Sequence, residues 1–219
     1  MIASKIISHI ISPLRTSDKG DEALTIMNVY QVKHLPIVNN ESFLGIISED
    51  DILNNDMNEP IGSYRLSLIK PFVYETDHVF DVMKKIAQSK LTTIPVIDEG
   101  ENYIGLITLE DVVNFYANSF SFNESGGIIV IEVHRNNYSM AEIARIVESS
   151  NAVIINSFIT SVPESNQLLV SLKLNTNELA VLIAAFQRFD YIVNSTFTEV
   201  EEFDNMKERY DSLMKYLSI

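Results

Sequence analysis

The chain has 219 residues, and its mass of 24.8 kDa suits two domains of ordinary size. With 46% apolar and 21% charged residues, it is neither a low-complexity nor a disordered sequence. Its 30 acidic residues outnumber the 16 Lys and Arg, which gives a net charge of -14 and argues against nucleic acid and anionic membranes as partners. The absence of Cys excludes disulfides and thiolate chemistry.

The first segment, residues 1–13, contains several Ile residues, but Lys5 and His9 interrupt them and no small-residue cleavage site follows. It therefore does not have the pattern of a secretory signal. No apolar run approaches the roughly 20 residues that a membrane-spanning helix needs. We expect a cytoplasmic protein.

An internal repeat organises residues 1–120. A shift of 59 residues superimposes Leu35-Pro36-Ile37-Val38 on Ile94-Pro95-Val96-Ile97. After one inserted residue, a shift of 60 superimposes Gly45 on Gly105. The copies are residues 1–58 and 59–120, and neither is long enough to bury a stable core alone. We therefore expect the two copies to share one core.

Each copy is predicted to form a strand, a helix, two strands and a second helix, from its apolar spacing and turn residues. Asp18 and Asp77, which superimpose, are expected to cap the first helices. The other predicted elements are strands at 35–38, 43–47, 94–97 and 103–107, and helices opening at 49–54 and 109–115.

Both second helices begin with a hydroxyl residue three positions before a carboxylate. The pairs are Ser48 with Asp51, and Thr108 with Asp111. At this spacing the two side chains can form a capping box. They can also face a cleft between the copies, because each pair stands at a strand-to-helix corner directly beyond a Gly-containing strand. The residues alone leave both interpretations open.

The repeated order of Pro-containing strand, turn, Gly-containing strand and hydroxyl-x-x-Asp corner resembles a tandem CBS domain pair over about residues 1–118. The stretch 32–38 is also similar to the first CBS module of the acetoin-utilisation protein B group. The resemblance implies that Ser48, Asp51, Thr108 and Asp111 hold the ribose hydroxyls of an adenosine compound through charge-assisted hydrogen bonds.

The resemblance also implies contacts to the base and the phosphates. His34-Leu35 and Thr93-Ile94 would line the slot for a purine ring, although Leu35 and Ile94 can equally be core residues. Lys33, His34, Lys70 and Lys90 lie near the expected phosphate contacts. Before Ser125, however, 9 Lys and Arg face 18 Asp and Glu. We therefore expect AMP, ADP or a less charged adenosine compound in preference to ATP, with S-adenosylmethionine as a further candidate and no required cofactor.

A different module follows the polar, Gly-containing stretch 120–127. We expect a strand at 128–133, a helix opened by a capping box of Ser139 and Glu142, strands at 152–160 and 167–174, a helix capped by Asn177, and a last strand at 191–200. This is the order of a ferredoxin-like βαββαβ unit. Over residues 127–200 it resembles an ACT domain, a regulatory module that often binds amino acids at a subunit interface.

The loop after the first strand of this module departs from the ACT pattern. Amino-acid-binding members usually carry an Asp and a Pro-Gly there, whereas this loop reads Arg135-Asn136-Asn137-Tyr138-Ser139. Tyr138 stands in the place of the Gly and would fill the usual pocket. We therefore favour ACT-mediated dimerisation over amino-acid sensing, with Arg135 and Asn137 as candidate ligand contacts.

Residues 201–219 are expected to add an amphipathic helix, which packs on its own domain or on a second subunit. The apolar residues at helical spacing are Phe203, Met206, Tyr210, Leu213, Met214 and Leu217.

No pattern in the chain indicates catalysis. The four His residues lack metal-like spacing, and zinc-protease, phosphate-loop and serine-hydrolase motifs are absent. We expect an α+β protein, a CBS pair followed by an ACT-like domain, that forms a homodimer and senses an adenosine compound for an unidentified regulated partner. The alternatives are a ligand-free structural dimer that docks a partner protein, and an amino-acid sensor.

Overall fold

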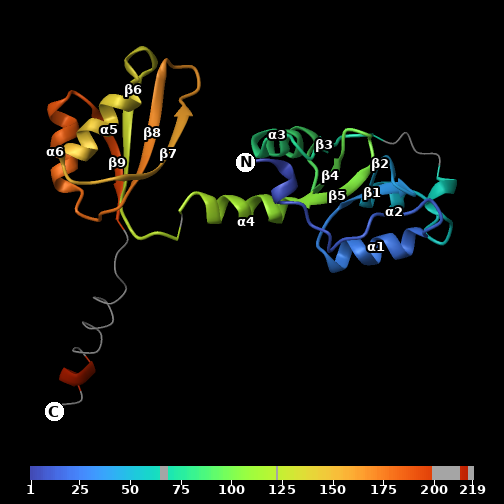
Figure 1. The fold of residues 1–219 in the computed structure, drawn as a ribbon. Coiled ribbons are helices and arrows are strands. Elements are labelled where there is room, and N and C mark those ends of the chain that lie inside the picture. Colours follow the sequence, from blue (N-terminus) through green and yellow to red (C-terminus); the bar gives the residue numbers. More distant parts are fainter. Residues whose placement is uncertain (65–68, 122, 199–212, 217–219) are drawn as a thin grey trace. The chain divides into compact units, whose positions relative to one another are not determined.

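The computed structural model describes residues 1–64, 69–121, 123–198 and 213–216 (Figure 1). The chain divides into two compact units, Met1–Tyr116 and Ala117–Ile219. The elements that begin in the first unit are η1 (Ala3–Lys5), α1 (Gly20–Val29), β1 (His34–Asn39), β2 (Ser42–Ser48), α2 (Glu49–Leu53), η2 (Ile61–Ser63), β3 (Val73–Tyr74), α3 (Val79–Ser89), β4 (Thr93–Ile97), β5 (Tyr103–Thr108) and α4 (Leu109–Ser119). Those of the second unit are β6 (Ile128–His134), η3 (Arg135–Asn137), α5 (Met140–Ser149), β7 (Ile154–Ser161), β8 (Gln167–Leu174), α6 (Ala180–Arg188) and β9 (Ile192–Phe197).

The two copies of the repeat have the same helices and hairpins but differ in their first strand. In the second copy that strand is β3, which pairs with β4 in parallel. In the first copy it shrinks to one parallel bridge between Leu14 and Ile37. In the second copy the ladder continues through Glu75, whose N–H donates to the Ile97 carbonyl at 3.1 Å.

The expected helix caps Asp18 and Asp77 are wrong in the same way in both copies. Helix α1 begins after Lys19 and α3 begins after His78. The Asp18 carboxylate instead accepts the Arg15 N–H at 2.7 Å, and the Asp77 carboxylate accepts the Tyr74 N–H at 3.0 Å. Both side chains close the turn that leads into the helix. Such local bonds compete with capping for short carboxylates.

The hairpins β1-β2 and β4-β5 are antiparallel and carry a bulge at the same repeat position. As expected, the copies share core residues. One buried cluster joins Phe43 and Ile46 from the first copy to Leu91 and Ile97 from the second. Leu106 of β5 also packs into the first copy's core. The apolar surface that each copy leaves open is therefore covered by the other.

The segment that enters each copy pairs with the hairpin of the other copy. The Ser8 N–H donates to the Leu106 carbonyl at 2.8 Å, and the Ile46 N–H donates to the Ile69 carbonyl at 3.0 Å. Where the first segment crosses β5, a Cβ on Gly105 would overlap Cγ2 of Ile7. This crossing gives a steric reason for glycine in the strand.

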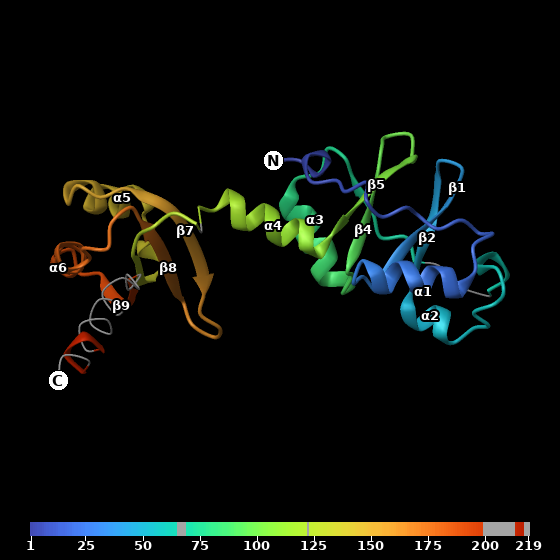
Figure 2. The same ribbon diagram turned by 90° about the horizontal axis from the view of Figure 1, so that it is seen from below.

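The second unit is a four-stranded antiparallel sheet in the order β7-β8-β6-β9, with α5 and α6 on one face (Figures 1 and 2). This arrangement has the predicted βαββαβ order of a ferredoxin-like unit. Its core lies between sheet and helices and includes Ile129, Leu172, Ile143 and Phe186. Alternation along β8 places Leu168, Val170, Leu172 and Leu174 on the helix side.

The predicted caps of the second unit are met in part. The Ser139 hydroxyl accepts the Glu142 N–H at 3.3 Å, but the Glu142 carboxylate accepts the hydroxyl of Tyr191 at 2.9 Å. Burial and this carboxylate raise the pKa of Tyr191 to about 12, which keeps its hydroxyl a donor. Asn177 does not cap α6, which begins after Leu179.

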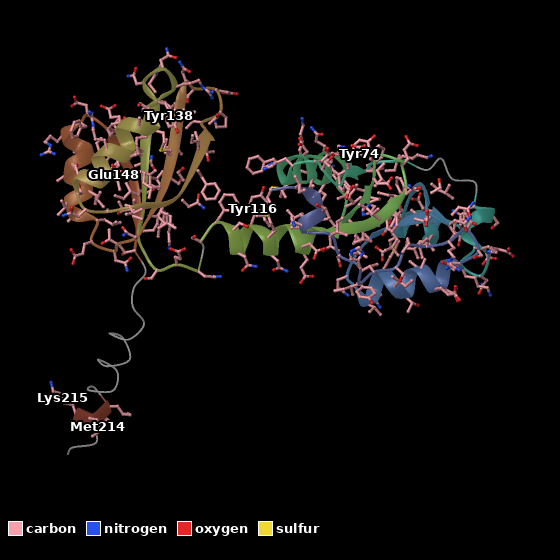
Figure 3. The ribbon with its side chains drawn as sticks, viewed as in Figure 1. Tyr74, Tyr116, Tyr138, Glu148, Met214 and Lys215 are labelled. Atoms are coloured by element: carbon pink, nitrogen blue, oxygen red, sulfur yellow. The ribbon has the colours of Figure 1, made fainter. Side chains whose placement is uncertain are left out.

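The expected C-terminal helix over residues 201–219 falls outside the described residues except for 213–216, which are helical (Figure 3). None of the helices among the described residues combines the length and apolar character needed to cross a bilayer.

Candidate functional site

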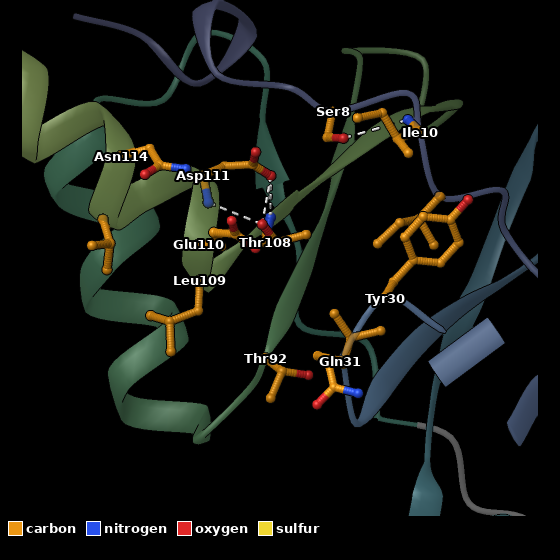
Figure 4. Close-up of a pocket in the computed structure, with 13 residues that line it drawn as sticks. Ser8, Ile10, Tyr30, Gln31, Thr92, Thr108, Leu109, Glu110, Asp111 and Asn114 are labelled. Atoms are coloured by element: carbon orange, nitrogen blue, oxygen red, sulfur yellow. Dashed lines mark hydrogen bonds between the residues drawn. The ribbon is translucent and has the colours of Figure 1, made fainter. Parts of the chain in front are cut away.

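A cavity of about 660 Å³ opens in the first unit beside the corner between β5 and α4 (Figure 4). Three stretches line it: part of the entering segment 8–11, residues 30–32 directly after α1, and Thr108 with the start of α4. Thr92, directly before β4, completes the wall. Because these stretches come from both copies, the cavity exists only when the copies are packed together.

Thr108 and Asp111 form one wall of this cavity. One carboxylate oxygen of Asp111, Oδ2, accepts the Thr108 hydroxyl at 2.7 Å and the Thr108 N–H at 2.9 Å. The Thr108 hydroxyl in turn accepts the Asp111 N–H at 2.9 Å. The other oxygen, Oδ1, has no hydrogen-bond partner in the described part of the chain. It is an available acceptor at the cavity wall.

Ser48 and Asp51 adopt the same geometry at the start of α2. Their hydroxyl and carboxylate lie 2.6 Å apart, and the reciprocal backbone bonds measure 2.9 and 3.1 Å. The capping box is therefore formed in both copies. It uses only one oxygen of each carboxylate, so capping and ligand binding do not exclude each other.

Tyr30, Gln31 and Val32 line the cavity, and none was a predicted site residue. Figure 4 shows the Tyr30 ring across the cavity from Thr108 and Asp111. Gln31 has a left-handed backbone with φ of 53°, and Lys90 at its repeat position has φ of 52°. The alignment of the two repeats identifies this turn in both copies. Its position opposite Asp111 depends on how the two copies pack against each other.

The predicted base slot is not formed by the side chains that we assigned to it. Leu35 and Ile94 are fully buried in separate cores. Thr93 is also fully buried, and its hydroxyl donates to the His34 carbonyl at 2.8 Å. Complete burial leaves these three side chains no surface for a ring. Their neighbour Thr92 lines the cavity instead.

His34 joins the two copies at the start of β1. Its Nδ1 accepts the Thr92 N–H at 3.2 Å and lies 3.1 Å from the Thr92 hydroxyl, which accepts the Lys33 N–H at 2.8 Å. A ring nitrogen that accepts an N–H carries no proton, so this contact requires neutral His34. Burial lowers the pKa of His34, against the opposing effect of Asp51. A phosphate contact by cationic His34 does not fit this geometry.

The fold should become less stable in mild acid because of His34. Its folded-state pKa lies below the ordinary value of 6.5, so the unfolded chain binds more protons as the pH falls below about 6.5. The contribution of neutral His34 to the free energy of unfolding is fully present above that pH, and it is lost as the pH falls toward the folded-state pKa. We expect the urea midpoint of His34→Gln to change less than wild type between pH 7.5 and 5.5. If the urea midpoint of His34→Gln changed with pH as much as that of wild type, this assignment would be contradicted. His9→Gln serves as the control, because His9 is exposed.

The three predicted lysines, Lys33, Lys70 and Lys90, lie outside the cavity lining. The Lys33 ammonium is 3.5 Å from the Glu49 carboxylate, in an exposed pair. Lys90 ends α3 at the position equivalent to Gln31. Within the described residues, no group of three or more His, Asp or Glu side chains is arranged to hold a metal ion.

In the second unit, Arg135 and Asn137 belong to η3, directly after β6. The Arg135 guanidinium donates to the Ser161 hydroxyl at 2.9 Å. Tyr138 is partly buried against the core of the unit. The side chain that replaces the expected glycine is therefore packed on the protein.

Residues 6–58 and 66–118 each match the CBS domain family. The first unit is a tandem CBS domain pair.

The chain is similar to homoserine O-acetyltransferase of Methanohalobium evestigatum, with 27% identity over 115 residues that cover 50% of this chain and 23% of the relative. It is also similar to inosine-5'-monophosphate dehydrogenase of Methanocaldococcus jannaschii, with 24% identity over 114 residues, covering 51% and 23%. It thus matches about a quarter of the length of these curated relatives.

Two solved structures are similar to about half of the chain. A CBS domain pair/ACT domain protein of Thermotoga maritima has 21% identity and a TM-score of 0.49, and the match covers 55% of this chain and 100% of that chain. CBSX2 of Arabidopsis thaliana, solved in complex with AMP, has 18% identity and a TM-score of 0.47, with 53% and 96% covered.

Proposed function

We propose that this chain is a non-catalytic regulatory protein that binds an adenosine-containing ligand in the cavity of its CBS pair. The observation that carries the proposal is the free carboxylate oxygen of Asp111 at the cavity wall, across from the ring of Tyr30. A carboxylate suits a ribose because the two vicinal hydroxyls can both donate to it. The aromatic ring suits the base because a purine stacks on it.

The dimensions and composition of the cavity support this assignment. Its volume of about 660 Å³ lies within the usual range of roughly 300–1,000 Å³ for small-molecule sites. Ile11 and Val32 contribute nearly buried apolar surface. The Gln31 amide nitrogen donates one hydrogen to the Asn28 carbonyl at 2.7 Å, so its oxygen and its second N–H are left for the edge of a base. An apolar wall with few polar groups is typical of such sites.

The position of the cavity also supports a regulatory role. Helix α4 begins at the ligand-binding corner and continues to Ser119, past the end of the first unit at Tyr116. A ligand held at Asp111 therefore contacts the element that leads into the second unit. Ligand binding shifts the chain from one conformation to another only if the ligand binds the two conformations with different affinity. Calorimetry with a series of ligands measures the affinity.

We further propose that the second unit is an ACT-like module through which the chain forms a homodimer. Its strand order supports this assignment, as does the packed Tyr138 at the position where amino-acid binders are expected to have glycine. We also propose that the chain is related to the acetoin-utilisation protein B group and that it is located in the cytoplasm. The residue boundaries 1–58, 59–120, 127–200 and 201–219 remain our domain assignment.

Calorimetry on the full chain tests the proposed ligand. The titrants are adenosine, AMP, ADP, ATP, S-adenosylmethionine and a set of amino acids. We expect saturable heat from at least one adenosine compound. Heat with amino acids alone would favour sensing by the second unit, and no heat with any titrant would favour a structural dimer that docks a partner protein.

Removal of the ring at Tyr30 should weaken this binding. Base–aromatic stacking contributes roughly 1 to 3 kcal/mol per base, so Tyr30→Ala should raise the Kd of the adenosine compound about tenfold or more. Tyr30→Phe keeps the ring and should bind within about threefold of wild type. An unchanged Kd for Tyr30→Ala, measured by the same calorimetry, would show that the base lies elsewhere.

A further inference from the structure

The cavity has an unusual charge for a site that would hold a phosphate. Of the described residues that line it, none is Lys, Arg or His, whereas Glu110 and Asp111 are both acidic. Phosphate sites in proteins rely on Arg, Lys or converging backbone N–H groups. Here the first turn of α4 carries carboxylates, and the Asp111 N–H is already bonded to the Thr108 hydroxyl.

The repeat shows where cations would stand. Lys33 is the equivalent of Thr92, because the Lys33 carbonyl accepts the Glu49 N–H at 2.9 Å and the Thr92 carbonyl accepts the Leu109 N–H at the same distance. Lys90 is the equivalent of Gln31, which has the same left-handed backbone. The Thr108–Asp111 cavity is thus lined by neutral Thr92 and Gln31. The equivalent positions with respect to the Ser48–Asp51 corner are both lysines.

We propose that the Thr108–Asp111 cavity selects an adenosine compound without phosphate groups and discriminates against nucleotides. This inference rests on the proposed adenosine site and narrows its ligand class. A phosphate monoester carries about -1.5 to -2 charges at pH 7. In a cavity of this size it would lie within about one Debye length, roughly 8 Å at physiological salt, of both carboxylates, with no lining cation to offset them.

Adenosine and AMP, titrated into the full chain, separate the two ligand classes. The measurements use Asp51→Ala, which removes the candidate ribose contact at the other corner. We expect adenosine to bind at least tenfold more tightly than AMP, and the ratio to grow when the salt is reduced from 150 to 20 mM because repulsion is then less screened. AMP binding as tightly as adenosine, or more tightly, would overturn the proposal.

Glu110→Gln tests the cause of the selectivity in the same background. It removes one negative charge from the lining, so the ratio of AMP to adenosine Kd should fall about threefold, with adenosine little changed. Glu99→Gln removes an exposed acid outside the lining and should leave the ratio unchanged. Equal effects of the two variants would overturn the charge argument.

The outcomes distinguish this inference from the proposed function. If both ligands bind but AMP binds more tightly, the adenosine site stands and the selectivity is wrong. If neither binds to a chain that still unfolds cooperatively with heat, the adenosine site itself is wrong, and the inference fails with it.

Discussion

Replacement of Asp111 by Ala is expected to weaken adenosine binding by about a hundredfold or more. The free oxygen of this carboxylate is the proposed acceptor for the two ribose hydroxyls, and a hydrogen bond to a charged group contributes roughly 1.5 to 3 kcal/mol. Loss of two such bonds exceeds the expected effect of any other single substitution in the cavity. Calorimetry of the full chain measures the change in Kd.

Asp51→Ala is the matched control for this experiment. Asp51 has the same capping bonds to Ser48 that Asp111 has to Thr108, so both variants should lose a similar stability of about 1 kcal/mol from the helix cap. Only Asp111→Ala should lose adenosine affinity at the Thr108–Asp111 cavity, which Asp51 does not line, and at this cavity Asp51→Ala should bind adenosine within about threefold of wild type. Equal weakening in the two variants would mean that the effect comes from capping rather than from contact with the ligand.

Gly105→Val is expected to have the largest effect on stability. A Cβ at this position would overlap Cγ2 of Ile7 and lie 3.3 Å from the ring of His9, where the entering segment crosses β5. Additional atoms in a close-packed site typically cost roughly 1 to 3 kcal/mol. The free energy of unfolding from urea titration should fall by that amount. Because Ser8 and Ile10 of the same segment line the cavity, adenosine binding should weaken as well.

A double-mutant cycle identifies the contact responsible. Ile7→Ala makes room for the new side chain, so the double variant should be more stable than the sum of the two single changes predicts. Gly100→Ala is the control, because its Cβ would meet only the partly exposed Asn102 and Asp98 side chains. Simple additivity of Ile7→Ala and Gly105→Val would show that the crossing is not the reason for glycine.

The local order of the chain determined much of the fold. The shifts of 59 and 60 residues predicted both hairpins, and the apolar spacing of residues 128–200 predicted the βαββαβ order. The Ser48–Asp51 and Thr108–Asp111 corners were also predictable, because their hydrogen bonds span three residues and depend on little beyond the start of a helix.

Tertiary packing decided which groups meet at the candidate site. The cavity joins Ser8, Tyr30 and Asp111, which are far apart in the sequence and share no local signal. Packing also buried Leu35 and Ile94, and turned His34 toward Thr92. Periodicity identifies an apolar residue but not whether a second copy covers it, because burial depends on contacts between distant segments. The sequence by itself therefore determined the helices and strands and the Ser48–Asp51 and Thr108–Asp111 corners. The packing of the two copies against each other determined where the cavity lies.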